Sequence, residues 1–308
     1  MTINEALREG KRLLASPCPG ACIDTPALDA ALLLAEITRL SREELFVRGN
    51  DPLSEGNHEK FLGLVERRRN GECAAYILGR KEFRGLEFLV NRNVLVPRPD
   101  TETIVEAALA YIDQMPEDQL SLLDLCTGSG AMAVSLKKER PFLSVTASDI
   151  SEEALETAAQ NAAALLDSPC SGEETQSGKH GGRTVQNARS IHSVRFIHSD
   201  LFDKIDGKYN IIVSNPPYVP SGELSALAPE VRLEPALALD GGEGGLELIR
   251  KIIPRAGDYL KPRGVLLLEA GSGQMPAISA LLEGNGFLDI RIHRDLADRE
   301  RVISARRH

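Results

Sequence analysis

The residues with the clearest chemical potential are Asn215-Pro216-Pro217-Tyr218, which follow the apolar run YNIIVS at 209–214. Proline lacks a backbone N–H and fixes φ, so the proline pair cannot lie inside a helix or a central strand. We therefore expect a stiff corner, in which the Asn215 side-chain oxygen and a main-chain carbonyl lie close together as acceptors. Two convergent acceptors match a planar –NH2 group with its two N–H donors. The Tyr218 ring adds an aromatic face for a flat group.

Such a corner has a chemical use, because a planar amide or aromatic amine is a poor nucleophile with a delocalised lone pair. Holding both N–H groups directs the lone pair toward an electrophile and stabilises the positive charge that develops on nitrogen. Alignment of the two reactants contributes further. The tetrapeptide thus predicts chemistry at an amide or amine nitrogen, with a proline-rich turn of no chemistry as the plain alternative.

A second motif, LLDLCTGSGAMA at 122–133, predicts a buried strand, a tight glycine turn and a helix. Gly128 and Gly130 let the backbone approach a ligand where a Cβ would clash. The spacing also satisfies a relaxed G-x-G-x-x-A dinucleotide fingerprint. Asp149 lies at the end of the next expected strand about 20 residues on, where an acid suits the hydroxyls of an adenosine ribose. These residues indicate an adenosine cofactor of either class, and Asp124 is expected to support the loop.

The two motifs together select the cofactor. The electrophile that an adenosine cofactor can offer to a nitrogen held at Asn215 is the sulfonium methyl group of S-adenosylmethionine. A nicotinamide cofactor would leave the tetrapeptide without a role. Methyl transfer to nitrogen is therefore the predicted chemistry.

The elements that must position these motifs alternate between strand-like and helix-like patterns. Such alternation predicts an α/β fold, a doubly wound parallel sheet with helices on both faces. The expected strands are 121–128, 143–150, 194–200, 209–218, 264–271, 287–293 and 301–306, and the expected helices begin near 131 and span 151–166, 244–260 and 274–284.

An N-terminal helical domain is expected over 1–80. Apolar residues recur at helical spacing in 28–40 and 58–72, and Asp24-Thr25-Pro26 is typical of a helix start. This domain could simply pack, or it could dock a partner protein.

The remaining boundaries follow from turn signals and composition. Alternation around Arg84-Gly85 predicts a β-hairpin that links the domains over 81–100. Residues 101–308 would then form the second domain. Within it, 167–190 are rich in Ser, Gly and charge and predict a mobile surface insertion.

Composition excludes several classes of protein. The 308-residue chain carries a net charge of −9, which disfavours a sequence-independent duplex binder. It has no apolar run near the ~20 residues of a membrane span, and its N-terminus has no long apolar segment typical of a signal peptide. Five cysteines form no C-x-x-C pair and six histidines are scattered, so neither a zinc site nor a disulfide framework is expected. A cytoplasmic protein without a metal is predicted.

Four motifs in order resemble those of class I S-adenosylmethionine-dependent methyltransferases of amino groups. Their last motif occurs in adenine methyltransferases and in protein glutamine methyltransferases. Three further stretches (66–91, 96–102 and 230–253) favour the second branch, and nearly the whole chain is similar to the peptide chain release factor glutamine methyltransferase family. The four motifs are Asp-Leu-Cys-Thr-Gly-Ser-Gly (124–130), Ser-Asp-Ile (148–150), Ser-Asp-Leu-Phe (199–202) and Asn-Pro-Pro-Tyr (215–218).

This resemblance implies a Rossmann-like methyltransferase domain and an N-terminal domain that helps dock a release factor. The implied reaction methylates the side-chain amide nitrogen of the glutamine in the factor's Gly-Gly-Gln loop. A monomer is expected, with no membrane or direct nucleic-acid partner. No general base is assigned, since the nitrogen can lose its proton after attack.

The resemblance also implies a role for each motif residue. Asn215, Pro216, Pro217 and Tyr218 would hold the glutamine; Asn215, Pro216 and Tyr218 would be the catalytic residues, with Asn215 nearest both substrate and cofactor. The implied cofactor contacts are Cys126, Thr127, Gly128, Ser129 and Gly130 around the methionine part, Asp149 and Ile150 by the ribose, and Asp200 and Leu201 by the adenine.

Some departures and alternatives remain at this point. Cys126 stands where many relatives have Gly, and Leu201 stands where some have an aromatic residue. The stretch 98–102 could order the cofactor entrance or form a plain interdomain turn. A glutamine methyltransferase for a ribosomal protein, an adenine methyltransferase for nucleic acid, and a non-catalytic cofactor-binding protein are the competing interpretations.

Overall fold

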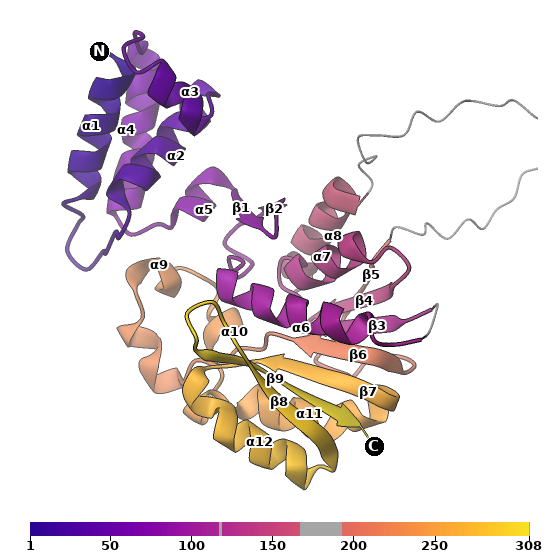
Figure 1. Ribbon diagram of the computed structural model, residues 1–308. Coiled ribbons are helices and arrows are strands. Elements are labelled where there is room, and N and C mark those ends of the chain that lie inside the picture. The colour runs from indigo at the N-terminus through magenta and orange to yellow at the C-terminus, as the bar shows by residue number, and fades with distance from the viewer. Residues whose placement is uncertain (117–118, 167–192, 308) are drawn as a thin grey trace, which may run out of the picture. The chain divides into compact units, whose positions relative to one another are not determined.

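The computed structural model describes residues 1–116, 119–166 and 193–307 and divides the chain into two compact units (Figure 1). The predicted insertion at 167–190 lies outside the described residues. Unit 1 comprises Met1–Lys81, Val90–Val96 and Gly222–Ala236, whereas unit 2 comprises Glu82–Leu89, Pro97–Ser221 and Leu237–His308.

Unit 1 is helical, as the periodicity of 28–40 and 58–72 predicts. Its second helix begins at Pro26, with Thr25 at the N-cap position. Leu33, Leu34 and Phe61 are fully buried in the core of this unit. Its helices are α1 (Ile3–Leu14), α2 (Pro26–Thr38), α3 (Arg42–Val47), α4 (Glu55–Arg69), α5 (Ala74–Leu78) and α9 (Pro229–Arg232).

A buried ion-pair cluster explains why α9 belongs to unit 1. Arg68 is 5% exposed; its guanidinium donates to the buried Asp29 at 2.7 Å and lies 2.9 Å from Glu230, whose side chain is 35% exposed. A buried charge needs such partners because its desolvation is costly. The segment around α9 is therefore held to the N-terminal helices by charge, a link between distant residues that the sequence patterns do not reveal.

The predicted hairpin is present and consists of β1 (Arg80–Phe83) and β2 (Leu86–Leu89). Its two turn residues, Arg84 and Gly85, have φ values of 50° and 71°. Positive φ at both central positions is the geometry of a type I′ turn, which matches the twist of a hairpin. The strands end at Leu89, and the chain continues to Arg98 without helix or strand.

Unit 2 contains a seven-stranded sheet in the order β5-β4-β3-β6-β7-β9-β8. β9 is antiparallel to both of its neighbours, so the expectation of a wholly parallel sheet is wrong for this strand. A short loop joins β8 to β9, and a parallel pair would need a long crossover connection. The strands are β3 (Ser121–Leu125), β4 (Ser144–Asp149), β5 (Arg195–His198), β6 (Tyr209–Ser214), β7 (Leu260–Glu269), β8 (Phe287–Arg294) and β9 (Glu300–Arg307).

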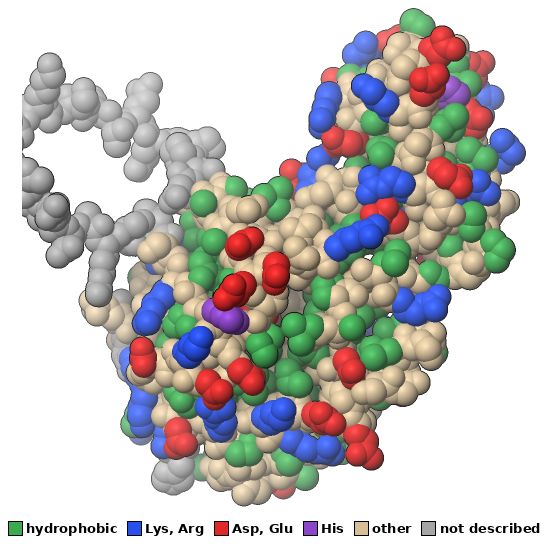
Figure 2. Space-filling view, turned by 180° about the vertical axis from the view of Figure 1, so that it is seen from behind, with side chains coloured by type: hydrophobic (Ala, Val, Ile, Leu, Met, Phe, Trp, Pro, Cys, Tyr) green, Lys and Arg blue, Asp and Glu red, His purple; other side chains and the backbone are tan. Residues whose placement is uncertain are grey.

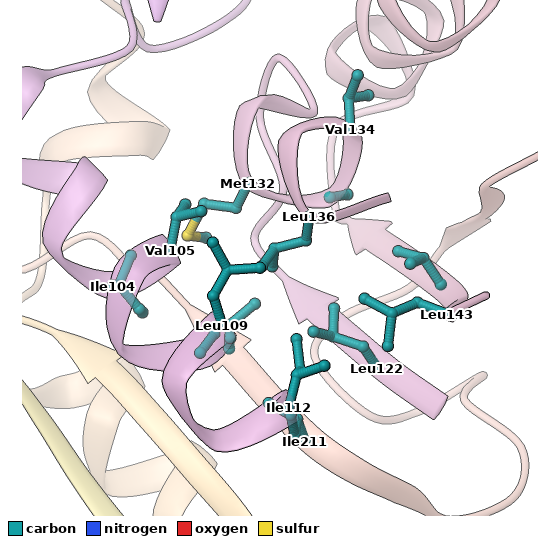
Figure 3. Packing of buried hydrophobic residues seen from close by; sticks show 14 of the residues in the cluster. Ile104, Val105, Leu109, Ile112, Leu122, Met132, Val134, Leu136, Leu143 and Ile211 are labelled. Carbon is teal, nitrogen blue, oxygen red and sulfur yellow. The ribbon is translucent and has the colours of Figure 1, made fainter. Parts of the chain in front are cut away.

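Helices cover both faces of this sheet, as predicted for a doubly wound fold. Leu122 points into a core shared with α6, α7 and α8 (Figure 3), while its neighbour Leu123 points into a second core shared with α11 and α12. Alternate strand residues thus fill opposite cores. The helical segments of unit 2 are α6 (Glu102–Ile112), α7 (Ala131–Glu139), α8 (Glu152–Leu166), α11 (Glu247–Tyr259) and α12 (Met275–Gly284), with 3-10 turns η1 (Pro99–Thr101), η3 (Glu243–Gly245) and η4 (Ser272–Gln274). The chain passes from unit 2 into unit 1 within η2 (Ser221–Ala226) and returns to unit 2 within α10 (Ala236–Leu239).

The surface is mixed in charge. Figure 2 shows acidic and basic side chains interspersed over one face. Within the described ranges, every helix is too short or too polar to cross a membrane.

Candidate functional site

The sheet register brings the predicted motifs to one edge. Leu125 of β3 pairs with Ser148 of β4 and with Ser214 of β6, and Ser214 pairs with Leu268 of β7. The strand order reverses between β3 and β6, which is where ligands bind in open α/β sheets. The residues immediately beyond these pairs, which lie at this edge, are Cys126, Asp149, Asn215 and Glu269.

Asp124 holds the glycine loop in place through hydrogen bonds to its carboxyl. Its carboxyl is fully buried, and Oδ2 accepts from the Thr127 hydroxyl at 2.7 Å and from the Ala133 N–H at 3.1 Å. Burial raises the pKa of Asp124 to about 7, although these two hydrogen bonds oppose the rise. The expected supporting role of Asp124 therefore has a direct geometric basis.

The loop itself has a left-handed backbone at three positions. Cys126, Gly128 and Gly130 have φ values of 60°, 56° and 80°. A Cβ at Gly130 would lie 3.1 Å from the Ala158 Cβ, whereas a Cβ at Gly128 would meet no heavy atom within 4 Å. Gly130 is thus required for packing against α8, and Gly128 faces open space that a ligand could fill. Cys126 adopts this backbone although it is not glycine, so glycine would fit position 126 with less strain.

The Asp149 carboxylate is tied to the same loop. Its Oδ2 accepts from the Gly128 N–H at 2.9 Å, and its Oδ1 accepts from the Ser151 N–H at 3.0 Å. Burial raises the pKa of Asp149, and the backbone hydrogen bonds counteract this shift. Its neighbour Ile150 is 47% exposed, so an apolar side chain stands beside the carboxylate. A carboxylate next to an open glycine backbone suits a hydroxylated ligand.

The two residues predicted to lie by the adenine occupy different environments. Asp200 is exposed, whereas Leu201 is 7% exposed and packs in the core on the α11 side. Leu201 has a φ of 46°, and its carbonyl accepts from the Ser199 hydroxyl at 2.9 Å. Most of the Leu201 side chain is therefore used for packing.

The tetrapeptide forms the expected corner beyond β6. Pro216 and Pro217 are buried, while Asn215 and Tyr218 are partly exposed. The Asn215 Nδ2 group donates to the Thr101 hydroxyl at 3.3 Å. This contact directs the nitrogen of the Asn215 amide toward Thr101, so Oδ1 is the atom that can accept a hydrogen bond from a ligand.

Tyr218 is fixed at both its ring and its backbone. The hydroxyl donates to Glu269 Oε1 at 3.4 Å, and the carbonyl accepts from Gln274 Nε2 at 2.9 Å. A Cβ at Gly245 would clash with the Tyr218 carbonyl oxygen, so the glycine-rich segment at 241–245 can wrap closely around it. Burial raises the pKa of Tyr218, which keeps its hydroxyl a donor.

Three residues of this site were missed by sequence reasoning: Thr101, Glu269 and Gln274. The sequence predicts for the stretch 98–102 only a cofactor entrance or a turn, but Thr101 contacts the tetrapeptide. Asp100 within it pairs with Arg299 at 3.1 Å and Arg301 at 2.9 Å, so its carboxylate anchors the stretch. Glu269 could have been found from the sequence as the acidic residue that ends the apolar run of β7.

Within the described part of the chain, no three His, Cys, Asp or Glu residues are grouped so as to hold a metal ion. The groups that this edge offers are a carboxylate beside an open glycine loop, with an oriented amide acceptor and an aromatic ring next to it.

Comparison with known protein families finds one match within unit 1 and one within unit 2. Residues 5–79 match the family described as PrmC N-terminal domain, and residues 102–171 match the methyltransferase small domain. Three relatives, each called release factor glutamine methyltransferase, align over most of the chain. The one from Neisseria gonorrhoeae is 40% identical (90% of this chain, 92% of the relative). Those from Cereibacter sphaeroides (38%; 99% and 99%) and Moorella thermoacetica (35%; 100% and 99%) align almost end to end.

Proposed function

Since the chain belongs to the family of release factor glutamine methyltransferases, we propose that it transfers a methyl group from S-adenosylmethionine to a release factor. The acceptor is the side-chain amide nitrogen of the glutamine in the factor's Gly-Gly-Gln motif. One observation carries this proposal: the Asn215 amide is oriented with Nδ2 toward Thr101, which leaves Oδ1 to accept from the substrate amide.

The residues at the sheet edge fit the cofactor. The space in front of Gly128 is open to 4 Å around an added Cβ, so the loop backbone can approach a ligand there. The Asp149 carboxylate suits the ribose hydroxyls, and the exposed Ile150 offers an apolar surface beside them. The segment from Cys126 to Gly130 would lie along the methionine part, and Asp200 would lie by the adenine.

The substrate amide needs two acceptors, because it presents two N–H donors. Asn215 Oδ1 supplies one and the Pro216 main-chain carbonyl supplies the other, held by a corner that proline makes rigid. The Tyr218 ring packs against the flat amide. Accepting both N–H groups directs the nitrogen lone pair outward and favours the charge that develops on nitrogen.

Bound S-adenosylmethionine would supply an electrophilic methyl group: the substrate nitrogen would form its bond to the methyl carbon as the carbon–sulfur bond breaks and its electron pair stays on sulfur. The methylated nitrogen then releases its extra proton to water. The residues described above therefore orient the amide and stabilise its charge, and none is required as a strong base.

Two other acceptors could undergo the same chemistry, but the family of this chain is named for the release factor. Adenine also presents a planar –NH2 group, and a ribosomal-protein glutamine would present the same amide. Because this chain belongs to the family of release factor glutamine methyltransferases, a release factor is the favoured partner.

The proposal is tested by methyl transfer from labelled S-adenosylmethionine to a purified release factor and to the same factor with its Gly-Gly-Gln glutamine replaced by alanine. Label should enter only the unmodified factor. Asn215→Ala should lower kcat by about 10²- to 10³-fold and leave the affinity for S-adenosylhomocysteine within about threefold. Asn285→Ala, which removes an exposed amide beyond α12, is the matched control and should retain full activity. Equal labelling of both factors would refute the proposal.

A further inference from the structure

The proline corner of the tetrapeptide depends on how its two ends are held. Pro216 and Pro217 have no backbone N–H, so the corner is stiff but has no donor at these positions to tie it to its surroundings. Its leading end is fixed by the sheet, because β6 is paired on both sides up to Ser214. The position of its trailing end, Tyr218, therefore depends on contacts with other segments.

One side-chain amide joins Tyr218 to two of these segments. Gln274 Nε2 donates to the Tyr218 carbonyl at 2.9 Å and to the Gly244 carbonyl at 3.0 Å. A longer contact of 3.4 Å reaches the Gly245 carbonyl. On the other side of the amide, Oε1 accepts from the Gly271 N–H at 2.9 Å. Carbonyls only accept and a backbone N–H only donates, so these partners permit one orientation of the amide.

Gln274 is itself firmly held. It is the last residue of η4 and comes directly before α12. Its backbone N–H donates to the Gly271 carbonyl at 2.9 Å, so its main chain and its side chain are bound to the same residue. Met275, which follows it, is fully buried in the core shared with α11 and α12. The amide is thus carried by a turn that is anchored in the core.

The glycine-rich segment at 241–245 leaves room for this amide. A Cβ at Gly245 would lie 2.5 Å from Gln274 Nε2 and 2.9 Å from the Tyr218 carbonyl carbon. A Cβ at Gly241 would lie 2.7 Å from the Tyr218 Cα. Only glycine permits so close an approach of two backbones. The Tyr218 carbonyl therefore lies near enough to this segment for one amide to bind both.

The neighbouring contacts leave the Tyr218 ring little freedom to turn. Val219 exchanges two backbone hydrogen bonds with the segment 239–241, at 2.9 and 2.8 Å. The Tyr218 carbonyl is held by Gln274, and the ring hydroxyl donates to Glu269 at 3.4 Å. Release of the carbonyl would remove the shorter of these two attachments of Tyr218.

We propose that Gln274 is a positioning residue of the methyl transfer: its amide fixes the trailing end of the tetrapeptide, and so the place of the Tyr218 ring against the substrate amide. Gln274 acts through the Tyr218 carbonyl and does not touch the reacting atoms. This inference rests on the proposed function, in which the ring packs on the glutamine amide. A misplacement of about 1 Å lowers a rate by about 10²-fold, so the effect of Gln274 belongs in kcat.

The first experiment measures kcat, KM for the release factor and affinity for S-adenosylhomocysteine in variants of the full chain. Gln274→Glu keeps the size of the side chain but places a carboxylate oxygen, which only accepts, against the Tyr218 and Gly244 carbonyls. It should lower kcat about 10- to 100-fold. Gln274→Met removes the hydrogen bonds without adding charge and should lower kcat about 3- to 10-fold. Both variants should keep the cofactor affinity within about threefold of wild type.

The control makes the same chemical change elsewhere in unit 2. Gln160→Glu lies on the exposed face of α8 and should keep wild-type kcat. A residue with a purely structural role would lower Tm and leave kcat per folded molecule unchanged. Wild-type kcat in Gln274→Glu, or a loss of kcat that only follows a loss of cofactor affinity, would overturn the proposal. Gln274→Met decides the question if Gln274→Glu does not fold.

A carbonyl NMR signal tests the contact without turnover. The dipeptide Tyr-Val occurs once in this sequence, at 218–219, so ¹³C-carbonyl tyrosine and ¹⁵N-valine together label a single peptide bond. Its carbonyl carbon resonance should move in Gln274→Met and stay in place in Gln160→Glu. An unchanged resonance in Gln274→Met would overturn the proposal. If the resonance moves but the wild-type chain leaves a release factor unmethylated, the proposed acceptor is wrong, whereas the hold of Gln274 on Tyr218 stands.

Discussion

The paired glycines of the cofactor loop offer a quantitative prediction, because both have positive φ but only one is crowded. Alanine at φ of 56° or 80° costs about 1–2 kcal/mol relative to a right-handed backbone. A more restricted unfolded chain returns about 0.4–1 kcal/mol of this. Gly128→Ala should therefore reduce the free energy of unfolding by about 1 kcal/mol.

Gly130→Ala carries a further cost. Its Cβ would lie 3.1 Å from the Ala158 Cβ and 3.3 Å from the Ala158 Cα, so the backbone of α8 must move. Such overpacking costs about 1–3 kcal/mol, which brings the total to roughly 2–4 kcal/mol. At about 2–4 °C per kcal/mol for a domain of this size, Gly130→Ala should lower Tm by at least 4 °C and Gly128→Ala by about 2–4 °C.

The assay is thermal unfolding followed by circular dichroism, with and without S-adenosylhomocysteine. A ligand at 100 times its Kd stabilises the folded state by about 2.7 kcal/mol, so the wild type and Gly130→Ala should both gain Tm. Gly128→Ala should lose most of that gain, since its methyl group enters the space assigned to the cofactor. Equal destabilisation by the two variants, or normal ligand stabilisation of Gly128→Ala, would refute this account of the loop.

Three further predictions concern buried polar groups. The pKa of Asp124 is about 7 in the folded chain and about 3.9 when unfolded, so the folded state binds more protons between these values and this carboxyl lowers stability as pH rises from about 4 to 7. Glu269 and Asp149, whose pKa values burial also raises, act in the same direction. In urea titrations Asp124→Asn should therefore lose less stability than the wild type between about pH 4 and 7, and an unchanged slope would contradict this. Asn161 is fully buried, accepts from the Leu89 N–H at 2.7 Å and donates to the Leu89 and Ser129 carbonyls. Asn161→Ala should therefore lower the free energy of unfolding by about 3 kcal/mol, whereas the exposed control Gln160→Ala should lower it by under about 0.5 kcal/mol. Similar stabilities of the two variants would contradict a stabilising role for these hydrogen bonds. Arg68→Ala should destabilise unit 1 by about 3–5 kcal/mol because Asp29 and Glu230 lose their buried partner, measured by urea unfolding with Lys60→Ala as the surface control; a loss below about 1 kcal/mol would show that this cluster is not stabilising.

Much of the α/β unit could be predicted because its signals are local. β3, β6 and β7 contain apolar runs, and the polar or acidic residues at the carboxyl ends of β4, β6 and β7 mark the ligand edge. The hairpin is also a local signal, because its turn consists of only two residues, Arg84 and Gly85, which both adopt positive φ.

The parts that could not be predicted depend on contacts between distant residues. Asn215 meets Thr101 across 114 positions, and Tyr218 meets Glu269 across 51. Periodicity carries no information about such pairs. The grouping of 222–236 with the N-terminal helices depends in the same way on Arg68 and Glu230, and the reversed β9 depends on the short loop before it.

The central claim is tested most directly by tandem mass spectrometry of a purified release factor after incubation with this chain and S-adenosylmethionine. The account predicts one added methyl group, located by fragmentation on the side-chain amide of the Gly-Gly-Gln glutamine, and none with Asn215→Ala. A methyl group on another residue, or no methyl group despite demonstrated cofactor binding, would contradict it.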